Sequence, residues 1–237
     1  MIPLATLGPL QPLRVVHADQ CDNVVMTLEL DHLFILTEPG AAAADLLTNI
    51  GFIEGAANDH HGQGTSNRRF FFDDFMLELL YVSDSREAME GPGRGLRLVE
   101  RASNYDASPF GLVFRKTDDS ISAPFRGWKY FPEYLGTGQY LYVGENSGHI
   151  DEPLCVQITN TPPHSEGNSG KGMFDRVTGI RVCYPTRRTS AVLDHIKQCQ
   201  MLSLVPGKSH LVEMVFNEHR ERQSRDLRPS LPLVVTW

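Results

Sequence analysis

Cysteine is scarce in this chain, and the few cysteines show no metal-binding spacing. The 237 residues contain four cysteines, none of them in a CxxC pair. Cys155 and Cys183 stand in apolar, strand-like runs, where a small core residue is the simplest interpretation. The pattern argues against a disulfide framework, so we expect a reducing, cytoplasmic compartment.

Long apolar runs and clustered positive charge are missing as well. No apolar run reaches the roughly 18 residues that a membrane-crossing helix needs. The net charge is -7, and the arginines between Arg220 and Arg228 alternate with acidic residues. Phosphate backbones attract clustered lysine and arginine. We therefore expect neither a membrane nor a nucleic acid as a partner.

The first 25 residues lack the pattern of a regular element. Pro3, Pro9 and Pro12 interrupt their apolar residues, and no basic segment precedes them, which argues against a signal peptide. We interpret residues 1–27 as an N-terminal arm and residues 28–237 as one domain. Deleting residues 1–25 should leave the thermal midpoint nearly unchanged.

What the chain does contain is an ordered series of elements between residues 28 and 82. Apolar runs predict strands, Pro39 suits a helix start, and Gly51 suits a helix end. The stretch after residue 54 is polar and rich in glycine, which predicts a loop. The expected elements are a strand over 28–36, a helix over 39–49, a short strand over 52–54, a loop over 55–67 and strands over 68–73 and 75–82.

Two polar residues interrupt the first and last of these strands. His32 lies within LDHLFIL and Glu78 within FMLELLYV. A polar side chain in a buried strand must be hydrogen-bonded, paired or bound to a ligand. Two interpretations stay open: the pair shares a divalent metal ion, or His32 and Glu78 bond each other in a partly wet cavity.

The loop NDHHGQGTSNRR is the second candidate for function. Gly62 and Gly64 would let the backbone approach a ligand closely. The alternative is a polar surface loop. Its donor-rich side chains favour a ligand-binding role, with His60 as a general base or further metal ligand. The candidate binding residues are His60, Gln63, Thr65, Asn67 and Arg68.

A second group of strands is expected over residues 110–115, 139–143 and 154–158. Between the first two lies the aromatic stretch FRGWKYFPEYL, with Trp128, Tyr130 and Tyr134. These rings either line a ligand pocket or pack as core and lid. Asn146 could contact a polar ligand group or form a turn, and residues 160–172 predict a mobile loop.

The last segment resembles the opening one. HLVEMVF is similar to FMLELLYV, which aligns Glu213 with Glu78, and TGIRVC aligns Gly179 with His32. We therefore predict a first module at 28–108 and a second half at 109–237, with a degenerate repeat at 174–237.

These motifs together resemble the glyoxalase-like domain proteins of the vicinal oxygen chelate superfamily, which also includes bleomycin resistance proteins and dioxygenases. The similarity rests on LDHLFI, HHGQGTSNRRF, LELLYV, FRGWKYFPEYL, ENSGHIDEPL, HLVEMVF and DLRPSLPLVVTW, and it covers about residues 28–237. It implies an α+β fold in which paired βαβββ modules form a curved, incomplete barrel around a cleft.

The resemblance also implies a metal site with ligands on the first and last strands of each module. Carried over, these are His32, Glu78 and Glu213, while Gly179 supplies no side chain. Such a set suits Zn²⁺, Mn²⁺, Fe²⁺ or Ni²⁺. We therefore expect a metal-dependent lyase, isomerase or dioxygenase that acts on a small oxygenated molecule, with Glu78 and His60 as catalytic groups. The alternative is a non-catalytic small-molecule binding protein. A homodimer stays open as the assembly.

Overall fold

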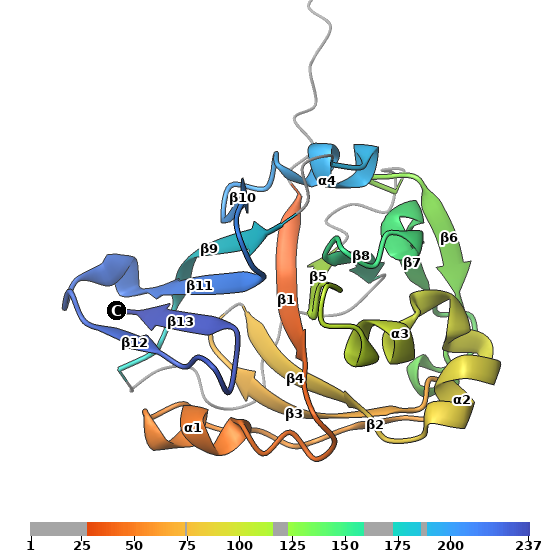
Figure 1. Cartoon of the computed structure of the whole chain (residues 1–237), viewed down its shortest axis with the longest axis horizontal. Helices are drawn as coiled ribbons and strands as arrows, with labels where there is room; N and C mark the ends of the chain where they lie inside the picture. The colour runs from red at the N-terminus through yellow and green to blue at the C-terminus, as the bar shows by residue number, and fades with distance from the viewer. Residues whose placement is uncertain (1–27, 74, 116–122, 159–172, 186–188) are drawn as a thin grey trace, which may run out of the picture.

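The fold consists of two β-sheets and a few short helices (Figure 1). The computed structural model describes residues 28–73, 75–115, 123–158, 173–185 and 189–237. The predicted arm at 1–27 and loop at 160–172 lie outside these residues. The strands are β1 (Glu29–Leu36), β2 (Asp59–His60), β3 (Thr65–Phe71), β4 (Met76–Val82), β5 (Phe110–Arg115), β6 (Gly127–Tyr130), β7 (Leu141–Gly144), β8 (Leu154–Ile158), β9 (Val177–Tyr184), β10 (Leu202–Pro206), β11 (Leu211–Phe216), β12 (Ser224–Asp226) and β13 (Leu233–Thr236). The helices are α1 (Ala44–Asn49), α2 (Ser85–Glu90), α3 (Leu98–Ser103) and α4 (Ala191–Ile196), with 3-10 turns η1 (Pro92–Leu96), η2 (Glu133–Leu135), η3 (Glu145–Gly148) and η4 (Asn217–His219).

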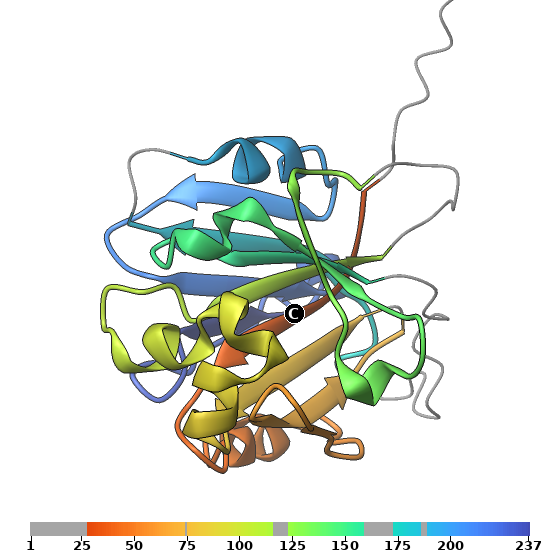
Figure 2. The same cartoon turned by 90° about the vertical axis from the view of Figure 1, so that its right-hand side faces the viewer.

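The larger sheet has eight strands and curves into a half-barrel, which confirms the predicted α+β fold (Figures 1 and 2). Its strand order is β2-β3-β4-β1-β5-β8-β7-β6. Strand β1 pairs in parallel with β4, and β5 pairs in parallel with β8. The antiparallel pairing of β1 with β5 joins these two four-stranded halves at the centre of the sheet.

The smaller sheet has five strands in the order β10-β9-β11-β13-β12. Its apolar residues, such as Ile180, Val212 and Met214, share one hydrophobic core with Leu33 and Leu77 of the larger sheet. A second core on the larger sheet contains Phe34, Leu36, Leu80 and Val113 together with Tyr130. Successive strand residues point to opposite faces, so the smaller sheet covers the face of β1 and β4 that carries Leu33 and Leu77.

The two ends of the chain differ in their strand pairing. Strands β9 and β11 are antiparallel neighbours, whereas β1 and β4 are parallel. The half that matches β1–β4 in its pairing is β5–β8. Short apolar strands with one glutamate look alike in sequence whatever their partners are, which is why HLVEMVF resembled FMLELLYV.

Several predicted elements differ from those observed, and the strand predicted over residues 52–54 is only an isolated bridge between Glu54 and Phe70. The first helix begins at Ala44 rather than Pro39, because Gly40 and Ala41 adopt positive φ angles of 82° and 46° that no helix continues through. The predicted polar loop contains β2 and the start of β3, and Thr65 and Asn67 within it are buried. Among the described residues, no helix is long and apolar enough to cross a membrane.

Candidate functional site

The candidate site lies on the face of the larger sheet that is turned away from the smaller sheet. Glu78 alternates along β4 with Leu77 and Leu79, both in the core shared with the smaller sheet. Its side chain therefore lies on the opposite face, and it is only 5% exposed. A carboxylate this buried requires compensating partners.

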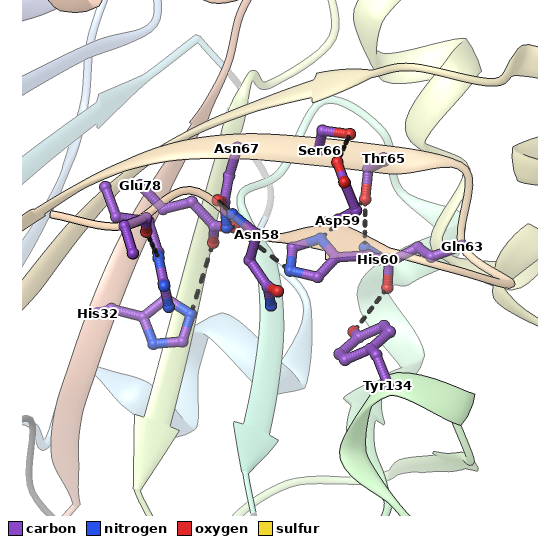
Figure 3. A network of polar contacts seen from close by, with 12 residues as sticks. His32, Asn58, Asp59, His60, Gln63, Thr65, Ser66, Asn67, Glu78 and Tyr134 are labelled. Atoms are coloured by element: carbon purple, nitrogen blue, oxygen red, sulfur yellow. Dashed lines mark hydrogen bonds and ion pairs between the residues drawn. The ribbon is translucent and has the colours of Figure 1, made fainter.

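Glu78 has a polar partner at each carboxylate oxygen (Figure 3). The Asn67 amide donates a hydrogen bond of 2.6 Å to Oε1. The His60 Nε2 atom lies 3.9 Å from the same oxygen, and the His32 Nε2 atom lies 3.8 Å from Oε2. Figure 3 shows the two imidazoles on either side of the Glu78–Asn67 pair. The two histidine side chains are 13% and 11% exposed, so they form the accessible edge of this cluster.

His32 is oriented by the residue next to it. The pairing of β1 with β5 shifts register between Leu30 and His32, which is a β-bulge at Asp31. A bulge interrupts the alternation of side chains. Here the Asp31 Oδ2 atom lies 2.7 Å from His32 Nδ1, and Leu30 packs in the core with Leu33 rather than on the His32 face.

A salt bridge holds the Asp31 carboxylate in turn. Arg115, at the end of β5, donates hydrogen bonds of 2.9 Å from Nε and 2.7 Å from Nη2 to Asp31 Oδ1. Asp31 is fully buried. Neither residue was predicted from the sequence, because strict alternation along a strand would place Asp31 on the face opposite His32. The available signal was an acidic residue adjacent to the histidine in an otherwise apolar strand.

His60 lies in the β2–β3 hairpin that the sequence analysis took for a loop. Its Nδ1 atom is 3.0 Å from Thr65 Oγ1, which also accepts a 2.8 Å hydrogen bond from Gln63. The Tyr134 hydroxyl donates to Gln63 Oε1, and the Tyr134 ring lies 4.6 Å from the His60 ring. Burial is the main cause that lowers the pKa of His60 below 6.5, against the opposing effect of the Glu78 charge. Burial raises the pKa of Tyr134 well above 10. Both side chains are therefore neutral near neutral pH.

The structure brings together five of the predicted site residues, namely His32, Glu78, His60, Thr65 and Asn67, with Gln63 beside them. Tyr130 and Gln63 lie close together, because both contact Gly93 at the same point. A Cβ added to Gly93 would be 3.1 Å from the Tyr130 hydroxyl and 3.2 Å from Gln63 Cγ. Burial raises the pKa of Tyr130 to about 12.

Three other predicted site residues, Arg68, Asn146 and Glu213, have partners outside this cluster, whereas Trp128 packs against the apolar residues on the Glu78 face, with its ring 6.3 Å from that of Tyr130. Arg68 binds Glu54 through two hydrogen bonds of 2.6 Å and Asp45 through one of 2.9 Å, which ties β3 to α1. Trp128 donates to Ser147, and the buried amide of Asn146 donates to Glu152 and to the Pro153 carbonyl. Glu213 lies in the smaller sheet, where it forms an ion pair of 3.3 Å with Arg181.

The predicted metal ligands do not converge. His32 and Glu78 lie on the face of the larger sheet turned away from the smaller sheet, which carries Glu213. Within the described ranges, no group of three or more histidine, cysteine, aspartate or glutamate side chains could hold a metal ion. Catalytic zinc sites have three protein ligands. Glu78 has a histidine facing each of its oxygens, His32 at 3.8 Å and His60 at 3.9 Å, but among the described residues these three side chains do not form such a group.

Comparison with known proteins supports the class that the motifs and the fold define. Residues 30–122 match the family described as a glyoxalase-like domain. This part of the chain carries β1 to β5 and the polar residues of the Glu78 cluster, which are His32, His60, Gln63, Thr65, Asn67 and Glu78. The resemblance to glyoxalase-like domain proteins is thereby confirmed over these residues.

Solved structures extend the similarity of fold. A hypothetical protein from Staphylococcus aureus is 12% identical, with a TM-score of 0.53, over 89% of this chain and 99% of that one. The methylmalonyl-CoA epimerase of Mycobacterium tuberculosis is 12% identical, with a TM-score of 0.36, over 56% of this chain and 89% of the epimerase. A Streptomyces coelicolor methylmalonyl-CoA epimerase in complex with 2-nitronate-propionyl-CoA is 14% identical, with a TM-score of 0.36, over 57% of this chain and 99% of that one. No curated protein matches the chain.

Proposed function

We propose that this protein is an enzyme that moves a proton on a small oxygenated molecule, as isomerases and lyases do, with Glu78 as the base. The observation that supports this most is the buried Glu78 carboxylate, which has an imidazole nitrogen facing each of its oxygens at 3.8 and 3.9 Å. Carboxylates and imidazoles are the side chains that exchange protons most readily near neutral pH.

In this proposal the Glu78 carboxylate takes a proton from a carbon next to the carbonyl of the substrate. The C–H bond breaks, its electron pair forms an enolate, and the proton resides on Glu78. Return of that proton to another atom gives an isomer, and loss of a leaving group from the enolate gives a lyase product. The imidazoles of His32 and His60 can relay the proton, and Asn67 fixes the carboxylate through its 2.6 Å hydrogen bond.

The divalent ion implied by the family resemblance does not fit the donors present. His32 and His60 flank Glu78 from different sides, and Asn67 already binds the oxygen that faces His60. No step is therefore derived through a metal ion. The substrate-binding roles proposed for Gln63 and Thr65 rest on their positions beside His60.

Hydrogen–deuterium exchange tests the proposal directly. The full chain would be incubated in D2O with 2-hydroxy aldehydes, 2-hydroxy ketones and 2-oxo acids, and deuterium uptake at carbon would be followed by NMR. We expect uptake with at least one class and a loss of roughly 10²-fold or more in Glu78→Gln, which keeps the shape but removes the base. Glu213→Gln, a matched change in the smaller sheet, should exchange like the wild type. Equal rates in wild type and Glu78→Gln would refute the proposal.

A non-catalytic small-molecule binding protein is the second candidate. It is favoured by the apolar group on the same face as Glu78, where Phe34, Leu36, Leu80 and Tyr130 pack together. The same NMR samples distinguish the two functions. Line broadening of a compound that never takes up deuterium would indicate a binding protein.

A further inference from the structure

His32 is preceded along its strand by Asp31, a buried aspartate that contacts both His32 and Arg115. Asp31 is fully buried, and its two carboxylate oxygens have different partners: Oδ1 accepts from Arg115, and Oδ2 lies 2.7 Å from His32 Nδ1. An ionised carboxylate only accepts hydrogen bonds. The proton between Asp31 and His32 therefore belongs to the imidazole, at Nδ1.

We infer that Asp31, anchored by Arg115, is a positioning residue that holds His32 in the tautomer with its proton on Nδ1. The imidazole nitrogen that faces Glu78 Oε2 across 3.8 Å then carries a lone pair and accepts a proton rather than donating one. This inference rests on the proposed function for its catalytic meaning. The tautomer assignment rests on the bonds of Asp31 to Arg115 and His32.

The substitution Asp31→Asn, which replaces one carboxylate oxygen by an amide nitrogen, tests the role of Asp31, because Arg115 determines which oxygen is replaced. In Asp31→Asn, both hydrogen bonds from Arg115 require an acceptor, so the amide oxygen stays at the Oδ1 position. The amide nitrogen then takes the place of Oδ2 and donates to His32 Nδ1. This forces the proton of His32 onto Nε2, where it faces Glu78 and blocks proton acceptance.

The tautomer of His32 can be read from long-range proton–nitrogen correlation spectra of the ¹⁵N-labelled full chain, assigned with His32→Gln. We expect Nδ1 protonated in the wild type and Nε2 protonated in Asp31→Asn. Arg115→Lys should retain the wild-type tautomer, since the carboxylate remains. Asp59→Asn is the matched control, because Asp59 bonds to Ser66 in the neighbouring hairpin. A wild-type protein with Nε2 protonated overturns the inference even if Asp31→Asn does not fold, and so does an unchanged tautomer in Asp31→Asn.

Deuterium exchange separates this inference from the proposed function. If both hold, Asp31→Asn lowers the exchange rate constant by roughly 10²-fold with a nearly unchanged KM, since Asp31 acts through His32 rather than on the substrate. If Glu78→Gln exchanges normally while the tautomer switches as expected, the proposed function fails and the positioning role of Asp31 stands. If the tautomer does not switch while Glu78→Gln loses exchange, the inference alone fails.

Discussion

At the scale of single residues, the chemistry of this protein depends on side chains that compensate one another away from water. Glu78 is stabilised by the amide of Asn67 and faces two imidazoles, and Asp31 is stabilised by Arg115. Each of these groups would cost several kcal/mol if it were buried alone, by an order-of-magnitude comparison with unpaired buried charges. Their grouping explains why one apolar face of the sheet carries a polar cluster.

The pH dependence of stability should report the burial of His60. Its pKa in the folded protein lies below 6.5, chiefly because burial disfavours the charged imidazole. As the pH falls through about 6.5, the unfolded chain binds a proton at His60 that the folded chain does not, so folding stability decreases until the lower folded-state pKa is passed. Above about pH 6.5 His60 is neutral in both the folded and the unfolded chain, so it no longer changes the free energy of unfolding.

Chemical denaturation between about pH 7 and about pH 5 measures this effect. We expect His60→Gln to lose less stability over that range than the wild type. His61→Gln, a change at the exposed neighbouring position, should follow the wild type. A wild-type pH slope in His60→Gln would contradict the burial argument.

At the scale of elements, the pairing of β1 with β5 beside the site depends on a glycine. Gly111 pairs with Phe34, and a Cβ at position 111 would lie 1.9 Å from the Phe34 ring. Only glycine leaves room for that ring on this face. The close approach of β5 also brings Arg115 to Asp31.

Substituting Gly111 should therefore destabilise the fold. We expect Gly111→Ala to cost about 1–3 kcal/mol, as overpacking in a core does, and to lower the thermal midpoint by several degrees. Gly148→Ala is the control, since a Cβ there meets no atom within 4 Å. Adding Phe34→Leu should recover part of the loss. A double variant no more stable than Gly111→Ala would show that Phe34 is not the cause.

The contact between α1 and β3 has a structural role that the sequence did not indicate. Arg68 was predicted to bind a ligand, but Glu54 and Asp45 occupy its guanidinium group. These bonds raise the pKa of Arg68, and the hydrogen bond to Glu54 is the largest cause.

Arg68→Ala should lower stability and leave ligand binding nearly unchanged. The partly exposed ion pairs of Arg68 with Glu54 and Asp45 stabilise the fold by about 1 kcal/mol after allowance for solvent screening. Their loss corresponds to a decrease of about 2–4 °C in the thermal midpoint of a chain of this size. Arg86→Ala removes an exposed helix pair and should shift the midpoint less. Thermal scans and titration with any compound active in the exchange assay measure the two effects. If Arg68→Ala bound the compound more weakly at unchanged thermal stability, Arg68 would have a ligand-binding role after all.

At the scale of the whole molecule, the packing of one sheet on the other decides which acidic residues can act together. The smaller sheet covers one face of β1 and β4, and the Glu78 cluster lies on the other. Glu213 therefore belongs to a different side of the larger sheet from His32, although both were expected to share one ion.

Metal content should reflect this separation. Protein purified without chelators or a histidine tag, then loaded with Zn²⁺ or Mn²⁺ and desalted, should retain clearly less than one ion per chain by mass spectrometry, because no three metal-binding side chains converge within the described part of the chain. Glu213→Gln should give the same content as the wild type. One tightly held ion per chain, lost in both His32→Ala and Glu78→Gln, would contradict the prediction and restore a metal centre.

The sequence by itself determined the class of fold, the strands that carry His32 and Glu78, and the family resemblance confirmed over residues 30–122. These follow from apolar periodicity and local motifs, which need no knowledge of distant contacts. Apolar periodicity missed β2 and the start of β3, because Thr65 and Asn67 are polar residues that are nevertheless buried. Thr65 is hydrogen-bonded to His60, and Asn67 to Glu78.

Only the tertiary structure decided which strands pair, where Asp31 points and what Glu213 touches. Strand pairing joins residues far apart in the chain, so β5–β8 rather than the last segment completed the curved sheet. The bulge at Asp31 arises from the register between β1 and β5, and no alternation within β1 alone reveals it. Which face of a strand meets the core depends on the sheet packed against it, and that packing separated Glu213 from the buried carboxylate of Glu78.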